Sequence, residues 1–243
     1  MKIRLDQHLV DTKFASDLVI ARAMIGAGEV YVNDTISDKA GTLISHLAEI
    51  RIKTRCPYVS RGGLKLAKGL AHFEFDVSDR VCIDIGASTG GFTDCLLQNG
   101  AKKVYAIDVA YGQLAWKLRQ DARVVVLERH NARKITPEDI EHEEIHLAVM
   151  DVSFISLTKI IPAIIPIFPG KINIISLIKP QFELPKDDIG PGGVVVEPKL
   201  HDKAILKIED FALKANLISK GVTESPIRGP KGNTEFLIHI TSS

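Results

Sequence analysis

The 243-residue sequence predicts an α/β fold with a mostly parallel, seven-stranded sheet and helices on both faces, preceded by a small α+β domain. Two observations indicate this fold. After residue 79, short apolar runs alternate with segments long enough for a helix, which is typical of strands buried in a parallel sheet. Before residue 54, two helix-spaced apolar segments precede short alternating runs, which indicates a separate and smaller domain.

The N-terminal part predicts two helices followed by strands. A break at Asp11-Thr12-Lys13 separates the helices, and Gly26 with Gly28 ends the second one. Strands are expected at residues 30–32 and 48–52, with a turn at Asn33-Asp34 after the first of them. The two helices are indicated by apolar residues that recur at helical spacing: Leu5, Leu9, Phe14, Leu18, Val19, Ala23 and Met24.

Residues 3–53, with the strings RLDQHLVDTKFASD and ARAMIGAGEVYVND, resemble the S-four RNA-binding domain, which is named for a small-subunit ribosomal protein. The resemblance implies that Arg4, Arg22 and Lys39 contact RNA. Asp17 departs from the family, which usually has arginine after its serine at this point. Taken alone, each of these basic residues fits an ordinary surface charge better than an RNA contact.

Positive charge gathers near the N-terminus. Residues 1–70 hold 11 Lys/Arg against 7 Asp/Glu, a net +4, whereas the rest holds 20 against 23, a net −3. Between Arg51 and Lys68 there are six basic residues and no acidic one, which suits a phosphate-rich polymer and equally a solvated basic face. Arg55 and Arg61 are therefore further candidate RNA contacts.

Residues 54–66 predict a linker, because Pro57 and the pair Gly62-Gly63 are turn formers. We place the RNA-binding domain at residues 1–58 and the second domain at 59–243. The second domain is expected to have strands at residues 80–85, 103–107, 123–127, 145–150 and 171–177, a helix at 200–216, and a final pair of strands at 221–227 and 234–240.

A glycine-rich loop follows the first of these strands directly. Its glycines at 86, 90 and 91 do not fit the G-x-G-x-x-G pattern of dinucleotide sites, and the loop lacks the lysine of a P-loop. A loop that begins with a carboxylate favours a cationic, amino-acid-like ligand without phosphates, and S-adenosylmethionine (SAM) is such a ligand. The candidate contacts are Asp84, Gly86, Ala87, Ser88, Gly90, Gly91 and Phe92.

Two further residues are candidates for the same ligand. Asp108 ends the second strand, 24 residues after Asp84, where dinucleotide-binding folds place the acid that binds ribose hydroxyls. Asn131 follows the third strand and could bind adenine. The alternatives are that Asp108 caps a helix and that Asn131 forms a turn, and the glycine-rich loop favours the ligand.

Several classes of protein are disfavoured. The most apolar stretch, residues 160–178, is broken by prolines, and the N-terminus lacks a signal-peptide pattern, so we expect a cytoplasmic protein without membrane contact. Three cysteines do not suggest disulfides, and only Cys56 is expected to be exposed. The string HEEIH at 142–146 matches a zinc-protease motif, but it lies in an acidic connection that runs into a strand. We therefore predict no metal site.

A resemblance to the TlyA-type family, which covers nearly the whole chain, is carried by the strings YVSRGGLKL, DIGASTGGFTDCLL, MDVSFISL, LIKPQFE and GNTEF. Members of this family pair an S-four domain with an FtsJ-like methyltransferase domain of Rossmann-like fold. The resemblance implies SAM-dependent methylation of cytidine 2′-hydroxyls in ribosomal RNA by a Lys-Asp-Lys-Glu tetrad. The matching residues are Lys65, Asp151, Lys179 and Glu235. The linker reads CPYV, where some members have Arg-x-Trp-Val.

A ribose hydroxyl is a weak nucleophile, so its proton must leave as the new bond forms. Lys179 lies between an apolar strand and Pro180, where desolvation favours a neutral amine, and a neighbouring Lys65 would act in the same direction. Asp151 and Glu235 would orient the lysines and the hydroxyl. The alternative is that these four residues form ordinary surface salt bridges.

Three questions stay open at this stage. The family is also annotated with haemolysin activity, so a membrane-active protein is one alternative, and an inactive RNA-binding assembly factor is another. The loop at residues 185–196 is rich in turn formers and is either a mobile lid or an inert excursion. The sequence does not determine the oligomeric state or the modified nucleotide.

Overall fold

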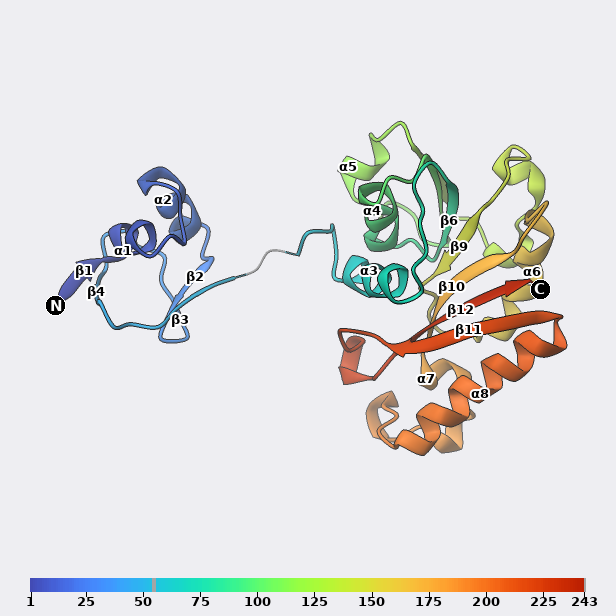
Figure 1. Cartoon of the computed structure of the whole chain (residues 1–243). Helices are drawn as coiled ribbons and strands as arrows, with labels where there is room; N and C mark the ends of the chain where they lie inside the picture. The colour runs from blue at the N-terminus through green and yellow to red at the C-terminus, as the bar shows by residue number, and fades with distance from the viewer. Residues whose placement is uncertain (54–55, 243) are drawn as a thin grey trace. The chain divides into compact units, whose positions relative to one another are not determined.

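The computed structural model describes residues 1–53 and 56–242, and the chain divides into two compact units, Met1–Arg55 and Cys56–Ser243 (Figure 1). This division lies three residues before the domain boundary expected from the sequence. Residues 57–59 belong with the second unit because Val59 N donates to Asp94 Oδ2 at 2.7 Å and Gln98 Nε2 donates to the Pro57 carbonyl at 3.0 Å.

The first unit has two short helices over two small sheets, around a core that includes Leu5, Leu9, Ile25 and Val30. Strand β2 pairs antiparallel with β3 and β5, and β1 pairs antiparallel with β4. The elements are β1 (Lys2–Arg4), α1 (Leu5–Asp11), α2 (Leu18–Gly26), β2 (Val30–Val32), β3 (Thr35–Ile36), β4 (Leu43–Ser45) and β5 (Ile50–Ile52).

The second helix of this unit begins later than the sequence suggested. Asp17 caps α2, because its Oδ1 accepts hydrogen bonds from Val19 N at 2.8 Å and Ile20 N at 2.9 Å. With this start, α2 buries Ala21 and leaves Val19 exposed. Phe14, which precedes the helix, and Ala23 are exposed too, so three residues of the expected apolar spacing do not belong to the core.

The second unit contains the expected seven-stranded, mostly parallel sheet, in the order β11-β12-β10-β9-β6-β7-β8. Within the described part of this sheet, β12 is the strand that runs against its neighbours. The strands are β6 (Val81–Ile85), β7 (Lys103–Asp108), β8 (Val124–Glu128), β9 (Leu147–Met150), β10 (Asn173–Ile178), β11 (Leu217–Glu224) and β12 (Phe236–Ser242).

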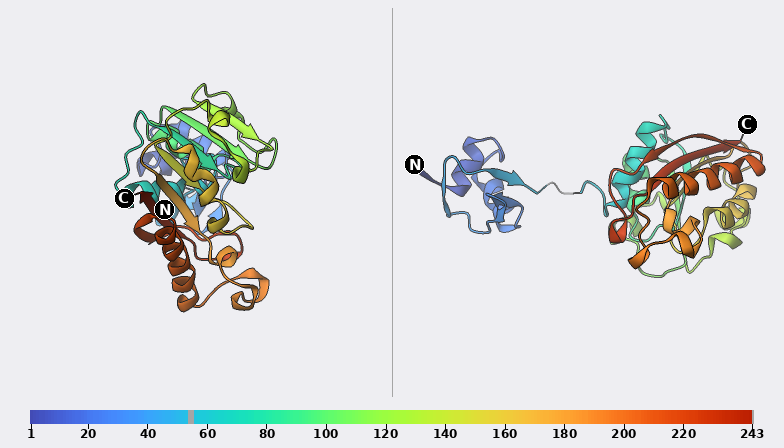
Figure 2. Two further views of the ribbon diagram at one scale, coloured as in Figure 1. Left: turned by 90° about the vertical axis from the view of Figure 1, so that its right-hand side faces the viewer. Right: turned by 90° about the horizontal axis from the view of Figure 1, so that it is seen from below.

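Helices cover both faces of the sheet, which confirms the fold class (Figures 1 and 2). One face carries α3 (Gly62–His72) and α4 (Gly91–Gln98), and the other carries α6 (Ile161–Ile164) and α8 (Pro198–Lys214). Two short helices, α5 (Trp116–Arg119) and α7 (Pro180–Glu183), follow β7 and β10. Short 3-10 helices occur at Ala132–Lys134, Pro137–Ile140, Leu157–Lys159, Ile165–Ile167, Lys186–Asp188, Pro191–Gly193 and Pro230–Gly232. In the described residues, the helices are all too short or too polar to span a membrane.

The linker expected at residues 54–66 is wrong at its C-terminal end, because α3 begins at Gly62. The glycines there serve close packing rather than chain flexibility. A Cβ at Gly63 would lie 2.2 Å from Tyr58 Cγ, so only glycine lets the helix rest on that ring. Residue 54 and the candidate RNA contact Arg55 lie outside the described residues.

The direction of β12 decides which residues gather at one edge of the sheet. Asp151 follows β9 and Lys179 follows β10, so both lie where the parallel strands end. Since β12 is antiparallel to β10, its first residue, Phe236, pairs with the last residue of β10, Ile178. Glu235 therefore reaches the same edge from the opposite chain direction.

A buried histidine lies on β12, on the face that packs against α3. The His239 ring contacts Phe73 and Phe75, with centroids 5.6 and 5.5 Å away. Its Nε2 is buried without a hydrogen-bond partner among the described residues, and burial lowers the pKa of His239 to about 4. The folded protein therefore holds this imidazole neutral.

We predict that His239 makes the protein acid-sensitive. The unfolded chain takes up this proton below its ordinary pKa of 6.5 and the folded chain only near 4. Between about pH 7 and pH 5, the free energy of unfolding of the wild type should therefore fall by about 2 kcal/mol relative to His239→Phe. Urea titrations at the two pH values measure this difference. His72→Phe, which alters an exposed ring of the same cluster, serves as the control, and an equal acid sensitivity in His239→Phe and wild type would contradict the prediction.

Candidate active site

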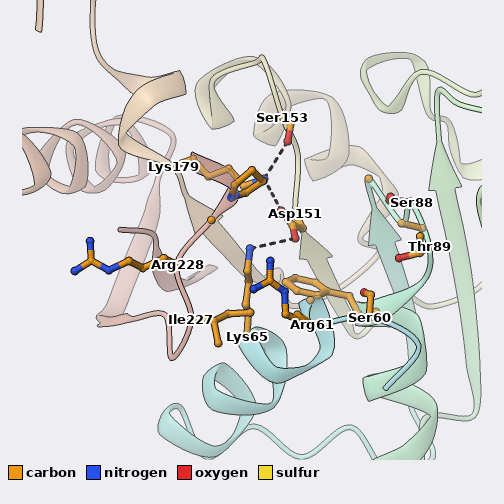
Figure 3. Close-up of a pocket in the computed structure, with 17 residues that line it drawn as sticks. Ser60, Arg61, Lys65, Ser88, Thr89, Asp151, Ser153, Lys179, Ile227 and Arg228 are labelled. Carbon is orange, nitrogen blue, oxygen red and sulfur yellow. Dashed lines mark hydrogen bonds and ion pairs between the residues drawn. The ribbon is translucent and has the colours of Figure 1, made fainter. Parts of the chain in front are cut away.

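Four charged side chains meet at the edge of the sheet where β9 and β10 end. Lys179 Nζ lies 2.5 Å from Asp151 Oδ1, and Lys65 Nζ lies 3.8 Å from Asp151 Oδ2. Lys65, which comes from α3, also donates to Glu235 Oε2 at 2.6 Å. Figure 3 shows the two lysines reaching the Asp151 carboxylate from different elements. The structure therefore brings together all four residues of the expected tetrad.

These contacts are buried, unlike ordinary surface salt bridges. The side chains of Lys65 and Lys179 are each 8% exposed, and that of Glu235 is fully buried. From the sequence, repulsion by Lys65 was expected to help make Lys179 neutral. The structure instead places the Asp151 carboxylate between the two lysines. Two positive and two negative charges then balance within the cluster.

The glycine-rich loop lies directly against this cluster. Gly86 has a φ of 82°, and a Cβ there would lie 2.9 Å from the carbonyl oxygen of Asp151. Any larger residue would therefore push the loop away from Asp151. Ala87, Ser88, Gly91 and Phe92 line a pocket that also contains Lys65 and Asp151.

Two of the expected ligand contacts lie beneath the loop instead. Asp84 is fully buried and accepts hydrogen bonds from Thr93 N at 2.9 Å and Thr93 Oγ1 at 2.6 Å. Burial raises the pKa of Asp84 to about 7, which does not suit a group meant to attract a cation at neutral pH. A Cβ at Gly90 would strike Leu114 and Leu118, so this glycine serves core packing. Neither residue lines the pockets around the tetrad.

A second pocket of about 500 Å³ holds the other candidate ligand residues. Asp108 lines it and accepts hydrogen bonds from Ser88 N at 2.7 Å and Ala110 N at 2.8 Å. Its carboxylate still has lone pairs for ribose hydroxyls, because each oxygen accepts more than one hydrogen bond. Asn131 lines the same pocket, while its Oδ1 accepts a hydrogen bond from Arg133 N. Asn131 thus forms the turn and also faces the pocket.

A third pocket adjoins the tetrad on the side of α7. It is lined by Lys179 and Glu235 and by two aromatic residues, Phe154 and Phe182, whose ring centroids are 5.0 Å apart. Phe154 is 91% exposed and has a φ of 63°, a strained conformation for an aromatic residue. Ser153 lines all three pockets and accepts a hydrogen bond from Lys179 Nζ at 3.0 Å.

Some residues of the site were not predicted from the sequence. Ser60 lines the first pocket and lies against Gly91, where a Cβ would approach the Ser60 Oγ too closely. The string SRGG just before Lys65 was the available signal for it. Ser153, Phe154 and Phe182 stand within two strings, MDVSF and KPQFE, that were used only for their charged residues.

Comparison with known proteins identifies the family. A model described as FtsJ-like methyltransferase matches residues 58–242. The chain belongs to the FtsJ-like methyltransferase family. It is 44% identical over 241 residues to a Mycobacterium tuberculosis protein named 16S/23S rRNA (cytidine-2′-O)-methyltransferase TlyA, covering 98% of this chain and 90% of that one. The resemblance to the TlyA-type family is thereby confirmed.

Two further relatives cover almost the whole chain. A Brachyspira hyodysenteriae protein named Hemolysin A is 42% identical over 242 residues, covering 98% of this chain and 99% of that one. A solved structure from Streptococcus thermophilus is 43% identical and covers 100% of this chain and 89% of that chain, with a TM-score of 0.77.

The candidate RNA contacts of this FtsJ-like methyltransferase lie in different places. Arg61 is exposed at the start of α3 and lines the first pocket beside Lys65 (Figure 3). Arg4, Arg22 and Lys39 belong to the first unit, where all three are exposed. Arg228 also lines the first pocket, although the sequence analysis did not single it out.

Two remaining segments of the methyltransferase unit have clear environments. His142 and His146 do not share a helix, because the 3-10 helix Pro137–Ile140 ends before them and β9 begins at Leu147. In the described residues, no group of three or more His, Cys, Asp or Glu side chains is arranged to hold a metal ion. The loop at residues 185–196 is fastened by Asn233, which accepts a hydrogen bond from Val195 N and donates one to the Gly193 carbonyl, each at 2.9 Å.

We predict that Lys65 and Glu235 are strongly coupled in their effect on stability, because each neutralises the other inside the protein. Lys65→Met should lower the free energy of unfolding by about 3 kcal/mol, because it leaves a buried carboxylate without its partner. The double variant Lys65→Met/Glu235→Gln should recover most of that loss. Denaturant titrations of the double-mutant cycle measure the coupling.

The control for this cycle is Lys203→Met, which removes an ion pair with Asp188 whose lysine is 56% exposed. Surface pairs of this kind contribute less than about 1 kcal/mol. If the double variant loses as much free energy of unfolding as the two single variants together, Lys65 and Glu235 are not coupled.

Proposed function

We propose that this chain transfers a methyl group from SAM to the 2′-hydroxyl of a cytidine in ribosomal RNA. One observation carries the proposal: the buried Lys179 pairs with the half-buried Asp151, and between them these two residues line all three pockets. The family supplies the reaction class. The substrate is suggested by the printed name of the M. tuberculosis relative, with which this chain shares 44% of aligned residues.

The second pocket suits SAM. Asp108 offers a carboxylate for the ribose hydroxyls, and Asn131 lies where it can contact adenine. The Gly86 backbone leaves room beside Asp151, in space that a Cβ would fill. Ser60, Ser88 and Thr89 line the adjoining first pocket with hydroxyl groups suited to the amino-acid part of SAM. When bound, SAM supplies a methyl group on a positively charged sulfur.

The third pocket suits the acceptor nucleoside. The exposed ring of Phe154 and its neighbour Phe182 offer an aromatic surface on which a base can stack. Lys179 lies between this surface and the SAM pocket, with its Nζ 5.9 Å from the centre of the Phe182 ring. A nucleoside seated there would bring its ribose to the tetrad.

The tetrad then controls one proton. The ribose oxygen forms a bond to the methyl carbon while the carbon–sulfur bond breaks, and the hydroxyl proton must leave as this happens. Lys179 is placed to orient that hydroxyl, and its Nζ accepts the hydroxyl proton after passing one of its own to Asp151, 2.5 Å away. Asp151 holds Lys179 in position, and Lys65 is in turn held by Glu235. Because this geometry exists before the substrate arrives, little reorganisation is needed during the reaction.

The first unit supplies RNA affinity in this proposal. Its resemblance to the S-four domain and the net positive charge of residues 1–70 both support this role. An intact tetrad favours an active enzyme over the inactive assembly factor considered from the sequence. A substrate in ribosomal RNA would also place the protein in the cytoplasm.

We predict that Asp108→Ala weakens SAM binding by about 10- to 100-fold, because it removes the acceptor for two ribose hydroxyls. Titration calorimetry with SAM measures this change, and circular dichroism checks that the fold is intact. Asp121→Ala, which removes a carboxylate that pairs with Arg123 near the protein surface, is the control. Unchanged SAM affinity in a folded Asp108→Ala protein would rule out this pocket.

We predict that Lys179→Ala lowers methyl transfer by about 1,000-fold, with SAM and RNA affinities near those of the wild type. Lys179→Arg should be similarly inactive, because a guanidinium keeps its proton at working pH. Transfer of labelled methyl from SAM to ribosomal subunits measures both variants. Lys214→Ala, at an exposed lysine of α8, is the control, and substantial activity in Lys179→Arg would contradict a role in proton transfer.

A further inference from the structure

One buried carboxylate organises the basic residues of the first unit. Asp6 lies on α1, with a side chain only 1% exposed. It accepts hydrogen bonds from Arg4 Nε at 3.0 Å and Arg4 Nη2 at 2.8 Å, and from Arg22 Nε at 3.0 Å. The Gln7 backbone N–H also donates to it. The hydrogen bond from Arg4, aided by that from Arg22, holds the pKa of Asp6 well below its usual range, so the carboxylate stays ionised.

The two arginines come from different elements and remain accessible. Arg4 ends β1 and Arg22 lies on α2, and their side chains are 53% and 56% exposed. The Arg4 guanidinium lies along the backbone at Gly41, where a Cβ would be 3.5 Å from Nη1. Asp6 N donates to the Ala40 carbonyl at 3.0 Å, which fixes the loop that contains Lys39. Two candidate RNA contacts from different elements therefore bind one acid, and the backbone of that acid holds the loop that carries Lys39.

Purely structural ion pairing does not explain this arrangement well. One buried carboxylate faces two arginines, so the group keeps a net positive charge at the surface. A guanidinium has five N–H groups, and the contacts with Asp6 use one of them on Arg22 and two on Arg4. The others remain for an anion with several acceptor oxygens. Such planar forks match phosphate, and holding them in place beforehand reduces the entropy lost on binding.

We propose that Asp6 is a positioning residue that holds Arg4 and Arg22 as a preformed site for the phosphate backbone of RNA. This inference rests on the proposed function, because it assumes that the first unit binds ribosomal RNA. On this inference, the negatively charged Asp6 raises the affinity of the protein for RNA, which is a polyanion. This effect is opposite to what net charge alone would produce.

The sign of that effect is the test. If only net charge matters, Asp6→Asn should bind RNA more tightly, because it removes a negative charge. Positioning predicts the reverse: affinity falls by about tenfold as both arginines lose their fixed geometry. The matched control is Asp34→Asn, which makes the same charge change in the same unit at a carboxylate that is 85% exposed and 3.5 Å from Arg51. It should bind RNA as tightly as the wild type or more tightly.

The measurement is binding of the full-length protein to purified ribosomal RNA over a range of salt concentrations. Arg22→Lys is the second variant, because it keeps the charge but cannot keep the Nε contact with Asp6. It should also bind more weakly, and both variants should melt cooperatively and retain wild-type affinity for SAM. In Asp6→Asn the dependence on salt should become shallower, by about one phosphate contact or more.

Two results would overturn the inference: wild-type or tighter RNA binding by a folded Asp6→Asn protein, or wild-type binding by Arg22→Lys. Both differ from a failure of the proposed function, in which the wild type itself would neither bind ribosomal RNA nor methylate it. Weaker binding by Asp6→Asn and Arg22→Lys, with Asp34→Asn unaffected, would support Asp6 as the positioning residue.

Discussion

The candidate active site depends on the carboxylate of Asp151. Two ammonium groups lie almost entirely inside the protein, and burying like charges together is costly without an anion between them. Asp151 supplies that anion by contacting Lys179 with one oxygen and Lys65 with the other. Its backbone carbonyl also sets how closely the glycine-rich loop can approach, because Gly86 lies against it. Asp151 thus sets the positions of both the loop and the two lysines.

The topology of the sheet explains how four residues so far apart in sequence meet there. Parallel strands place Asp151 and Lys179 at one edge, as in other open α/β sheets whose ligands bind beyond the strand ends. Glu235 directly precedes β12, which runs antiparallel to β10, so it reaches the same edge. Helix α3 crosses the same edge and contributes Lys65. An acid and a base then alternate around the cluster, which makes the burial of four charges tolerable.

The same physical device occurs in the first unit on a smaller scale. Asp6 is buried and ionised, and it holds two arginines that stay open to solvent. In the methyltransferase unit, the corresponding carboxylate holds lysines inside a pocket, where the proposed function has them act on a reacting group. A buried anion can thus prepare cations for binding or for chemistry, and the exposure of the cations decides which.

The sequence alone determined the alternating strands and helices through apolar periodicity, and the family through short motifs, because both are local properties of a chain. The four tetrad residues were predicted from the resemblance that those motifs carry. Only the tertiary structure decided what these residues do to one another. Asp84 and Gly90 stand in the glycine-rich loop by sequence, but their neighbours Thr93 and Leu118 assign them to the interior. The position of Asp151 between two lysines was likewise invisible, since electrostatic contacts depend on distances that only the folded sheet fixes.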